Sequence, residues 1–187
     1  MKKCLIVIDM QNDFITGALG TQEAERIVKG VCARIRSAAE AGEEVLVTMD
    51  THTDGYLETQ EGKNLPVPHC VKGTEGWELC PQVRSSLPEY AVRFEKPSFG
   101  SRELFEYVQR REYDRIEFCG LCTDICVISN AMGIKAFLPE AEILVNASCC
   151  AGVTPESHQC ALRSMQACQI HIIHTDERER ECRNTLF

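Results

Sequence analysis

Cys4-Leu5-Ile6-Val7-Ile8-Asp9, near the start of the 187-residue chain, is the stretch that decides the fold class. Its apolar run is shorter than the apolar region of a secretory signal and ends in a carboxylate. An unbroken run rich in β-branched residues predicts a strand that is covered on both faces, as in a parallel sheet. We therefore expect helices on both sides of this strand.

Further apolar runs predict the other strands of the same sheet. They lie at residues 45–49, 91–94, 116–119, 143–145 and 170–173. Strands that alternate with helical patterns predict right-handed crossovers and parallel pairing. The expected fold class is α/β, a three-layer α/β/α arrangement of Rossmann-like type with a mainly parallel six-stranded sheet. Residues 1–187 are expected to form this as a single domain, because the chain is of ordinary domain length.

Helical patterns lie between these runs. The clearest covers residues 24–38, with Thr21 placed to cap its start and Gly42 just past its end. Shorter helices are expected around residues 104–108 and from 123 or 124 towards 136. A last helix opens with Thr154-Pro155, and its spacing directs Cys160 and Cys168 inward together with Ala161 and Met165.

Composition narrows the class of protein. The net charge of −8 and the scattered basic residues disfavour nucleic acid and anionic membranes as partners. No apolar stretch approaches the roughly 20 residues that cross a bilayer. Twelve cysteines in a chain of this length are expected to be reduced thiols, since disulfide scaffolds are usually short secreted chains. These features predict a cytoplasmic protein, and the mixed charges of residues 176–187 are given no function.

Three ionisable side chains follow predicted strands: Asp9, Lys96 and Cys126. Ligands of open parallel sheets bind beyond the carboxyl ends of the strands, so these side chains can meet in one cleft. A cysteine in a first helical turn faces unpaired N–H groups that favour its thiolate, and a nearby lysine adds to this effect. Taken singly, the three also fit a surface turn residue, a solvated lysine and a core thiol.

A second group of polar residues flanks the long irregular segment 51–68, which is too long to be a mere connector. Asp50 and His52 point the same way in extended chain, and His69 can close from across the loop. Two imidazoles and a carboxylate suit zinc, with manganese or iron as alternatives, and Glu61 is a weaker fourth candidate. The same residues also fit a loop held by ordinary hydrogen bonds.

Four segments together resemble the isochorismatase-like cysteine hydrolases in order and separation. They are Asp9-Met10-Gln11-Asn12-Asp13-Phe14, Asp50-Thr51-His52, His69-Cys70-Val71-Lys72-Gly73-Thr74-Glu75-Gly76 and Gly120-Leu121-Cys122-Thr123-Asp124-Ile125-Cys126-Val127. The last is the strongest, with a small-residue turn, Thr-Asp and a cysteine three positions after the threonine. The metal residues and the His-Cys-x-x-Gly-Thr-x-Gly run look like the nicotinamidase (pyrazinamidase) branch.

The resemblance implies roles for the residues that match its motifs. Cys126 would be the nucleophile, Asp9 the base that deprotonates it and Lys96 the cation that orients both. The backbone N–H groups of Cys122 and Cys126 would form an oxyanion hole, with a cis peptide between Leu121 and Cys122. By the same resemblance, the metal held by the Asp and His residues contacts the ring nitrogen of the substrate, as it does in nicotinamidases.

The substrate pocket is where the chain departs from this pattern. Phe14 and Leu121 are expected to line it. Nicotinamidases usually carry an aromatic residue, often Trp, three positions before the histidine matching His69, whereas this chain has Pro66 there. Two expectations stay open: Tyr56 or Trp77 supplies the ring, or the ring is missing from this pocket.

The resulting hypothesis is a cysteine amidohydrolase that converts nicotinamide to nicotinate and ammonia through a thioester, a step of NAD salvage. Two alternatives stay open at this point. One is an amidase of the same family that acts on another small amide or carbamoyl compound. The other is a non-catalytic metal-binding or partner-binding module, in which Asp9, Lys96 and Cys126 do not converge. A homo-oligomer is expected, although no segment identifies its surface.

Overall fold

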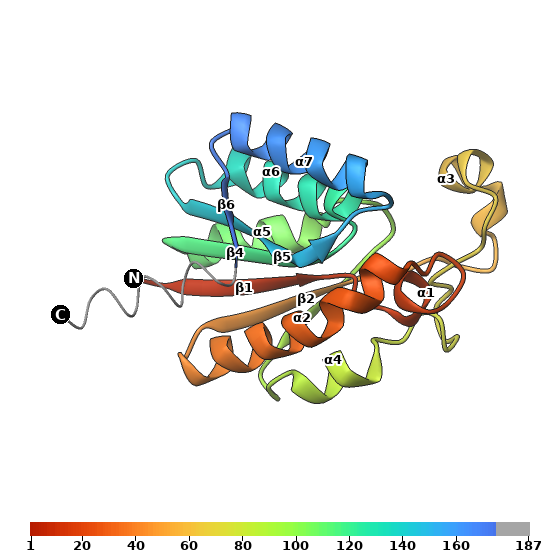
Figure 1. Ribbon diagram of the computed structural model, residues 1–187, viewed down its shortest axis with the longest axis horizontal. Helices are drawn as coiled ribbons and strands as arrows, with labels where there is room; N and C mark the ends of the chain where they lie inside the picture. Colours follow the sequence, from red (N-terminus) through yellow and green to blue (C-terminus); the bar gives the residue numbers. More distant parts are fainter. Residues whose placement is uncertain (175–187) are drawn as a thin grey trace.

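The structure is a computed structural model and describes residues 1–174. At its centre is a six-stranded sheet with the strand order β3-β2-β1-β4-β5-β6 (Figure 1). The strands are β1 (Lys3–Ile8), β2 (Glu44–Asp50), β3 (Val92–Lys96), β4 (Arg115–Leu121), β5 (Glu142–Ala151) and β6 (His171–Ile173). All neighbouring strands pair in parallel, so the predicted parallel sheet is confirmed.

The helices cover both faces of this sheet. In Figure 1, α6 and α7 lie above the sheet, and α2 and α4 lie below it. The helices are α1 (Asn12–Ile15), α2 (Gln22–Glu40), α3 (Gln60–Asn64), α4 (Pro81–Ser86), α5 (Arg102–Arg111), α6 (Ile128–Phe137) and α7 (Pro155–Ala167). The predicted three-layer α/β/α arrangement is therefore confirmed.

The unbroken apolar run of β1 is explained by its central position. Cys4, Ile6 and Ile8 pack in the cluster beneath α5, α6 and α7, whereas Leu5 and Val7 pack against α2 and α4. Because successive side chains of a strand point to opposite faces, burial of both faces requires apolar residues at every position. Each such side chain stabilises the fold by about 1.5–3 kcal/mol.

Two of the predicted helices begin where their capping residues lie. The Thr21 side chain accepts the backbone N–H of Ala24 at the start of α2. At the start of α7, Thr154 and Ser157 form a reciprocal capping box, with Pro155 in the first turn. Each cap satisfies N–H groups that have no partner within the helix.

The prediction that Cys160 and Cys168 point inward is wrong, because both are exposed. The buried face of α7 is formed by Ala161, Leu162 and Met165. The periodicity predicts a wider apolar stripe than the helix has, since only a narrow face of α7 contacts the sheet.

The long segment after β2 is partly helical. It contains a short 3-10 helix, η1 (Tyr56–Glu58), and α3, which lies beyond the carboxyl edge of the sheet (Figure 1).

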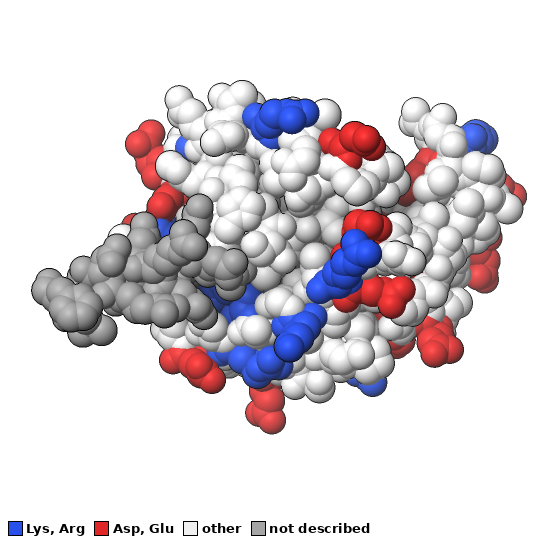
Figure 2. Space-filling view, viewed as in Figure 1, with Lys and Arg blue, Asp and Glu red and all other residues white. Residues whose placement is uncertain are grey.

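Within residues 1–174, no helix combines the length and apolar character needed to span a bilayer. On the face shown in Figure 2, acidic and basic side chains lie close together. The charged tail 176–187 lies outside the described residues.

Candidate active site

The three ionisable side chains predicted at strand ends lie together. Asp9 follows β1, Lys96 is the last residue of β3, and Cys126 lies in a π-helical turn, η2 (Thr123–Val127), between β4 and α6. The Lys96 Nζ atom is 2.7 Å from Asp9 Oδ2 and 3.3 Å from Cys126 Sγ. The non-catalytic alternative, which requires these groups to stay apart, is not favoured by this geometry.

Burial strengthens the electrostatic interactions among the side chains of this cluster. The side chains of Asp9 and Lys96 are fully buried, and Cys126 is 6% exposed. A buried lysine is costly unless it is paired and hydrogen-bonded. Lys96 meets this requirement through Asp9 and through Asp50, whose Oδ1 atom is 3.1 Å from Nζ.

Asp9 is held in a defined orientation. Its φ of +47° is uncommon for a residue other than glycine. The Thr48 hydroxyl donates to Asp9 Oδ1 over 2.6 Å, and the Asp9 N–H donates to the Thr48 carbonyl over 3.2 Å. Sequence reasoning missed Thr48, because a polar residue within a buried strand gives no sign of the neighbour it will meet.

Burial shifts the pKa values of both the Cys126 thiol and the Asp9 carboxyl. Burial raises the pKa of the Cys126 thiol well above its ordinary value, and Asp9 raises it further, although Lys96 acts in the opposite direction. Burial also raises the pKa of the Asp9 carboxyl, against the lowering effect of Lys96. Desolvation of the thiol thus opposes the stabilisation of the thiolate that the first helical turn and Lys96 are expected to provide.

The turn that carries Cys126 has an unusual backbone. Gly120 has a φ of +116°, and a Cβ atom there would lie 2.1 Å from the Ile8 carbonyl oxygen, so only glycine fits. The peptide between Leu121 and Cys122 is cis, as the family resemblance implies.

Asn130, fully buried on α6, fastens this turn to the loop after β3. Its Nδ2 group donates to the carbonyls of Cys126 (2.7 Å) and Phe99 (2.9 Å). Its Oδ1 atom accepts the Ser101 N–H over 2.9 Å. Asn130 was also missed by sequence reasoning, because its role exists only once α6 and the loop are in contact.

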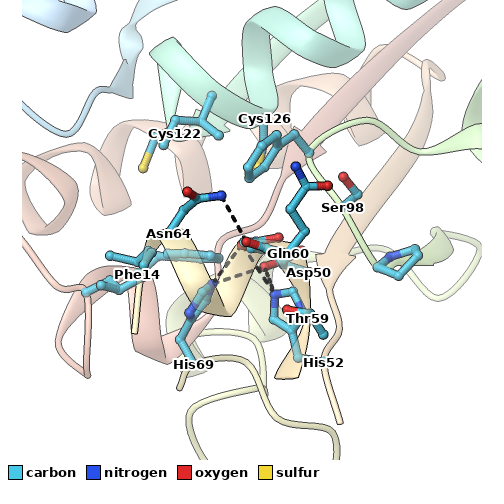
Figure 3. Close-up of a pocket in the computed structure, with 16 residues that line it drawn as sticks. Phe14, Asp50, His52, Thr59, Gln60, Asn64, His69, Ser98, Cys122 and Cys126 are labelled. Atoms are coloured by element: carbon cyan, nitrogen blue, oxygen red, sulfur yellow. Dashed lines mark hydrogen bonds and ion pairs between the residues drawn. The ribbon is translucent and has the colours of Figure 1, made fainter. Parts of the chain in front are cut away.

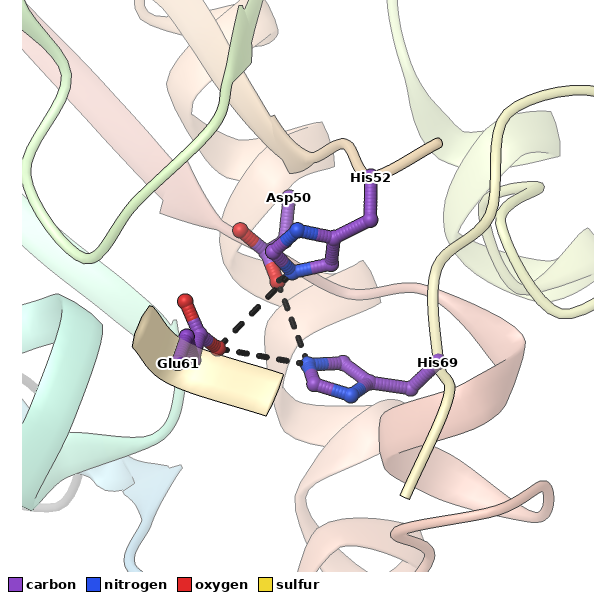
Figure 4. A group of neighbouring side chains, drawn as sticks. All are labelled: Asp50, His52, Glu61 and His69. Carbon is purple, nitrogen blue, oxygen red and sulfur yellow. Dashed lines mark hydrogen bonds and ion pairs between the residues drawn. The ribbon is translucent and has the colours of Figure 1, made fainter. Parts of the chain in front are cut away.

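The four metal candidates form a second group, drawn in Figure 4. Each of Asp50, His52, Glu61 and His69 offers one ligand atom, and these atoms all lie within 4.8 Å of one another. Asp50 Oδ2 is 2.9 Å from His52 Nε2 and 3.5 Å from His69 Nε2. Glu61 Oε1 is 3.8 Å and 3.7 Å from the same two nitrogens.

These separations fit a divalent metal. With bonds of about 2.0–2.1 Å, the ligand atoms of a tetrahedral zinc ion lie about 3.3 Å apart. His69 Nδ1 is 2.8 Å from the Val67 carbonyl, the kind of contact that orients a ligating imidazole. Although burial acts to raise it, hydrogen bonds from His52 and His69 hold the pKa of Asp50 well below its usual range. The carboxylate is thus ionised, as a metal ligand requires.

Asp50 connects the two groups, since Oδ1 faces Lys96 and Oδ2 faces the histidines. Its backbone is fixed by the side chain of Gln11, which accepts the Asp50 N–H over 2.7 Å and donates to the Asp50 carbonyl over 2.8 Å. Gln11 is a buried residue of the motif after β1 that had no predicted role of its own.

A cavity of about 560 Å³ opens onto both groups (Figure 3). Such a volume lies in the range of small-molecule sites. Cys126, Cys122 and Phe14 line it together with the metal candidates, as do residues of α3 and of the loop after β3 that were not predicted. The unpredicted lining residues include Gln60, Asn64, Ser98 and Phe99.

The other predicted pocket residues do not line this cavity. Tyr56 lies behind the histidines, with its ring centre 4.7 Å from that of His52 and 4.9 Å from that of His69. The Trp77 indole donates instead to the Thr51 hydroxyl over 2.9 Å. Leu121 is buried in the apolar cluster between the sheet and α2. Tyr56 therefore supports the histidines, and neither Tyr56 nor Trp77 replaces the aromatic residue absent at position 66.

Comparison with known proteins places this geometry in a family. Residues 3–177 match the family model described as the Isochorismatase domain. The chain belongs to the isochorismatase family. An isochorismatase family protein of Bacillus subtilis (strain 168) is 30% identical over 176 residues, covering 87% of this chain and 93% of the relative. The chain is accordingly a hydrolase of the isochorismatase-like type.

Two further relatives of this isochorismatase-family chain have more specific names. The nicotinamidase/pyrazinamidase of Mycobacterium tuberculosis (strain ATCC 25618 / H37Rv) is 26% identical over 186 residues, covering 91% of this chain and 98% of the relative. The crystal structure of the pyrazinamidase of Pyrococcus horikoshii in complex with zinc superposes with a TM-score of 0.82 at 29% identity. That superposition covers 93% of this chain and 99% of the other.

Proposed function

We propose that this isochorismatase-family protein hydrolyses nicotinamide to nicotinate and ammonia in the cytoplasm. The observation that carries the proposal is the position of Lys96 Nζ, within 2.7 Å of a buried carboxylate and 3.3 Å of a buried thiol, where the thiol borders a cavity. The relative in Mycobacterium tuberculosis that is named nicotinamidase/pyrazinamidase supports the choice of substrate.

In the first step, Cys126 Sγ attacks the amide carbonyl carbon while Asp9 takes the thiol proton. Both groups contact Lys96 Nζ, which is 2.7 Å from Asp9 Oδ2 and 3.3 Å from Cys126 Sγ, so the carboxylate and the thiol lie close to each other. Burial raises the pKa of the Asp9 carboxyl, which makes Asp9 a stronger base for this transfer than a free aspartate. Lys96 stabilises the negative charge that passes between them.

The second step breaks the carbon–nitrogen bond. The backbone N–H groups of Cys122 and Cys126 stabilise the oxyanion, a contribution of about 3–4 kcal/mol per donor in comparable sites. Asp9 returns its proton to the departing nitrogen, which leaves as ammonia, and a thioester remains on Cys126. Asp9 then takes a proton from water as the water oxygen attacks the thioester carbonyl carbon. The carbon–sulfur bond breaks, Asp9 returns this proton to the Cys126 sulfur, and the acid product loses its own proton to solvent and leaves as nicotinate.

Asp50, His52, Glu61 and His69 are proposed to hold a divalent metal, zinc first, with manganese or iron as alternatives. When bound, such a metal supplies a Lewis acid at the cavity wall that can hold a ring nitrogen of the substrate. The neighbouring Asp50 carboxylate is shared with Lys96, so these residues also keep the metal site in register with the triad.

The proposal is tested by measuring ammonia release from nicotinamide by the purified protein. We expect turnover by the wild type, loss of turnover in Cys126→Ala, and retention in Cys160→Ala, which removes an exposed thiol of α7. Turnover that survives Cys126→Ala at the wild-type level would end the proposed mechanism.

The substrate is tested separately with benzamide, which lacks the ring nitrogen, and with a small carbamoyl compound. Preference for nicotinamide over benzamide is expected, since contact between a metal and the ring nitrogen matters only for pyridine-type substrates. Faster cleavage of the carbamoyl compound would assign the chain to another amidase activity of the family.

A further inference from the structure

The turn that carries Cys126 is fastened to the start of α7 by two contacts. Thr123 Oγ1 lies 2.8 Å from His158 Nδ1. The Asp124 carboxylate accepts the Val153 N–H, at 3.1 Å and 3.3 Å from its two oxygens. The resemblance to known hydrolases gave His158 no role.

The His158 contact joins two well-fixed segments. Thr123 is fully buried within η2, so its hydroxyl has no access to solvent. His158 lies one turn into α7, behind the capping box of Thr154 and Ser157. Gly152 packs directly on the first turn of α7, because a Cβ atom at position 152 would lie 2.9 Å from the His158 backbone nitrogen. The His158 imidazole thus acts as a strut, meaning a fixed contact between α7 and the η2 turn that carries Cys126.

The position of Thr123 in the chain gives this strut a consequence for catalysis. Thr123 directly follows Cys122 and lies three residues before Cys126, the two residues whose N–H groups are proposed to bind the oxyanion. A shift of Thr123 therefore moves the Cys122 N–H, and donors of this kind act only within narrow distances. His158 itself does not line the cavity around Cys126.

We propose that His158 is a positioning residue that holds Thr123, and through it the oxyanion-binding turn, in its catalytic geometry. The inference rests on the proposed amide hydrolysis and names a residue beyond its triad. Burial lowers the pKa of His158. The nearby His174 also lowers this pKa, whereas the negative charge of Asp124 acts to raise it. The ring is therefore neutral at neutral pH and can pair with a hydroxyl through Nδ1.

The experiment compares His158→Leu, which removes the ring nitrogen, with His158→Asn, whose amide can reach the position of Nδ1. For nicotinamide hydrolysis, we expect His158→Leu to lower kcat by about tenfold, part of the loss seen when an oxyanion donor is removed, with little change in KM. His158→Asn should recover most of the loss. Gln159→Ala, an exposed neighbour on α7, is the matched control and should behave as wild type.

Thr123→Val, which replaces only a hydroxyl with a methyl group, should match His158→Leu. The double variant should be no worse than either single variant, because both remove the same contact. Additive losses, an Asn variant as impaired as the Leu variant, or an unchanged kcat in His158→Leu would each overturn the proposal. If His158→Leu does not fold, the comparison of Thr123→Val with wild type decides the question.

A second readout separates this inference from the proposed function. The rate at which iodoacetamide alkylates Cys126, followed by peptide mass spectrometry, reports the geometry of the turn without any substrate. If the wild type hydrolyses no amide, the proposed function fails. The strut would then still be supported if the Cys126 alkylation rate is altered in both His158→Leu and Thr123→Val and is restored in His158→Asn. Identical alkylation rates in the wild type and these three variants would refute it.

Discussion

At the scale of single residues, the site depends on Lys96 as the common partner of three groups. Its Nζ atom contacts Asp9, Asp50 and Cys126, all of them buried. Although burial acts to lower it, these neighbours raise the pKa of Lys96 well above its ordinary value, so the ammonium remains charged. In the proposed mechanism, the Lys96 charge permits a buried carboxylate and a buried thiol to exchange a proton.

The raised pKa of Asp9 predicts the acid limb of the pH–rate profile. Asp9 must be ionised to accept the thiol proton, so kcat/KM should fall with a midpoint above about pH 3.9, the ordinary aspartate value. The same shift means that the folded protein binds this proton more tightly than the unfolded chain. The stability from Asp9 is thus present below the unfolded pKa and is lost as pH rises through the folded pKa.

The profile should be measured with metal content recorded at each pH, because protonation of the histidines also releases metal. Full activity at pH 4 with the metal retained would contradict the raised pKa.

The sequence predicted those residues whose position follows from the rules of the parallel sheet. Asp9 and Lys96 could be placed because they stand where strands end, and the ends of parallel strands share one edge. Thr48 and Asn130 could not, because a polar residue within a buried element reveals neither the direction of its side chain nor its partner. The raised pKa of Cys126 was missed for a related reason, since it depends on how deeply the turn is buried.

At the scale of elements, the segment between β2 and β3 supplies three of the four metal candidates, His52, Glu61 and His69. His52 pairs with Val71 in an isolated parallel bridge, which brings the chain around His69 beside the end of β2. Glu61 comes from α3, a five-residue helix whose N-cap is Thr59. The sequence predicted the segment as part of the site but not this local pairing, because two bridge residues carry no periodic pattern.

Glu61 is expected to be a metal ligand, so Glu61→Gln should weaken zinc binding. Because loss of an indirect ligand contact already costs about 10–100-fold in affinity, we expect at least about tenfold. A chelator-competition titration of the metal-free protein measures this value. Lys63→Gln, an exposed change on the same helix, is the matched control. Equal zinc affinity in the Glu61 and Lys63 variants would remove Glu61 from the ligand set.

At the scale of the whole molecule, the layers are joined by polar contacts as well as by the apolar clusters. Arg34 on α2 forms a bidentate pair with Glu117 on β4, at 2.9 Å and 3.1 Å, and also contacts Glu43. Asn146 on β5 donates to the same Glu117 carboxylate over 3.1 Å. This network lies between the sheet and α2 and fixes the helix at a defined position.

Glu117→Gln should destabilise the fold while leaving the chemistry of the site intact. Removing one member of a buried ion pair leaves a charge without its main partner, and we expect a loss of about 3 kcal/mol in the free energy of unfolding, measured in urea. Glu23→Gln, which breaks the exposed pair with Arg26, should change it by less than about 0.5 kcal/mol. Similar losses in both variants would show that burial does not strengthen the Arg34 network.

The expected self-association of the chain remains a prediction, which light scattering after size-exclusion chromatography would measure. It does not bear on the triad, since Asp9, Lys96 and Cys126 all come from the same chain.

In the proposed reaction, Cys126 forms a covalent bond to the acyl group of the substrate. This step is tested most directly by acid-quenching the enzyme during turnover of nicotinamide and mapping the modified peptide by mass spectrometry. A nicotinoyl thioester on Cys126, absent from Cys126→Ala, is the predicted result. Turnover without an acyl group on Cys126, or with one on another cysteine, would contradict it.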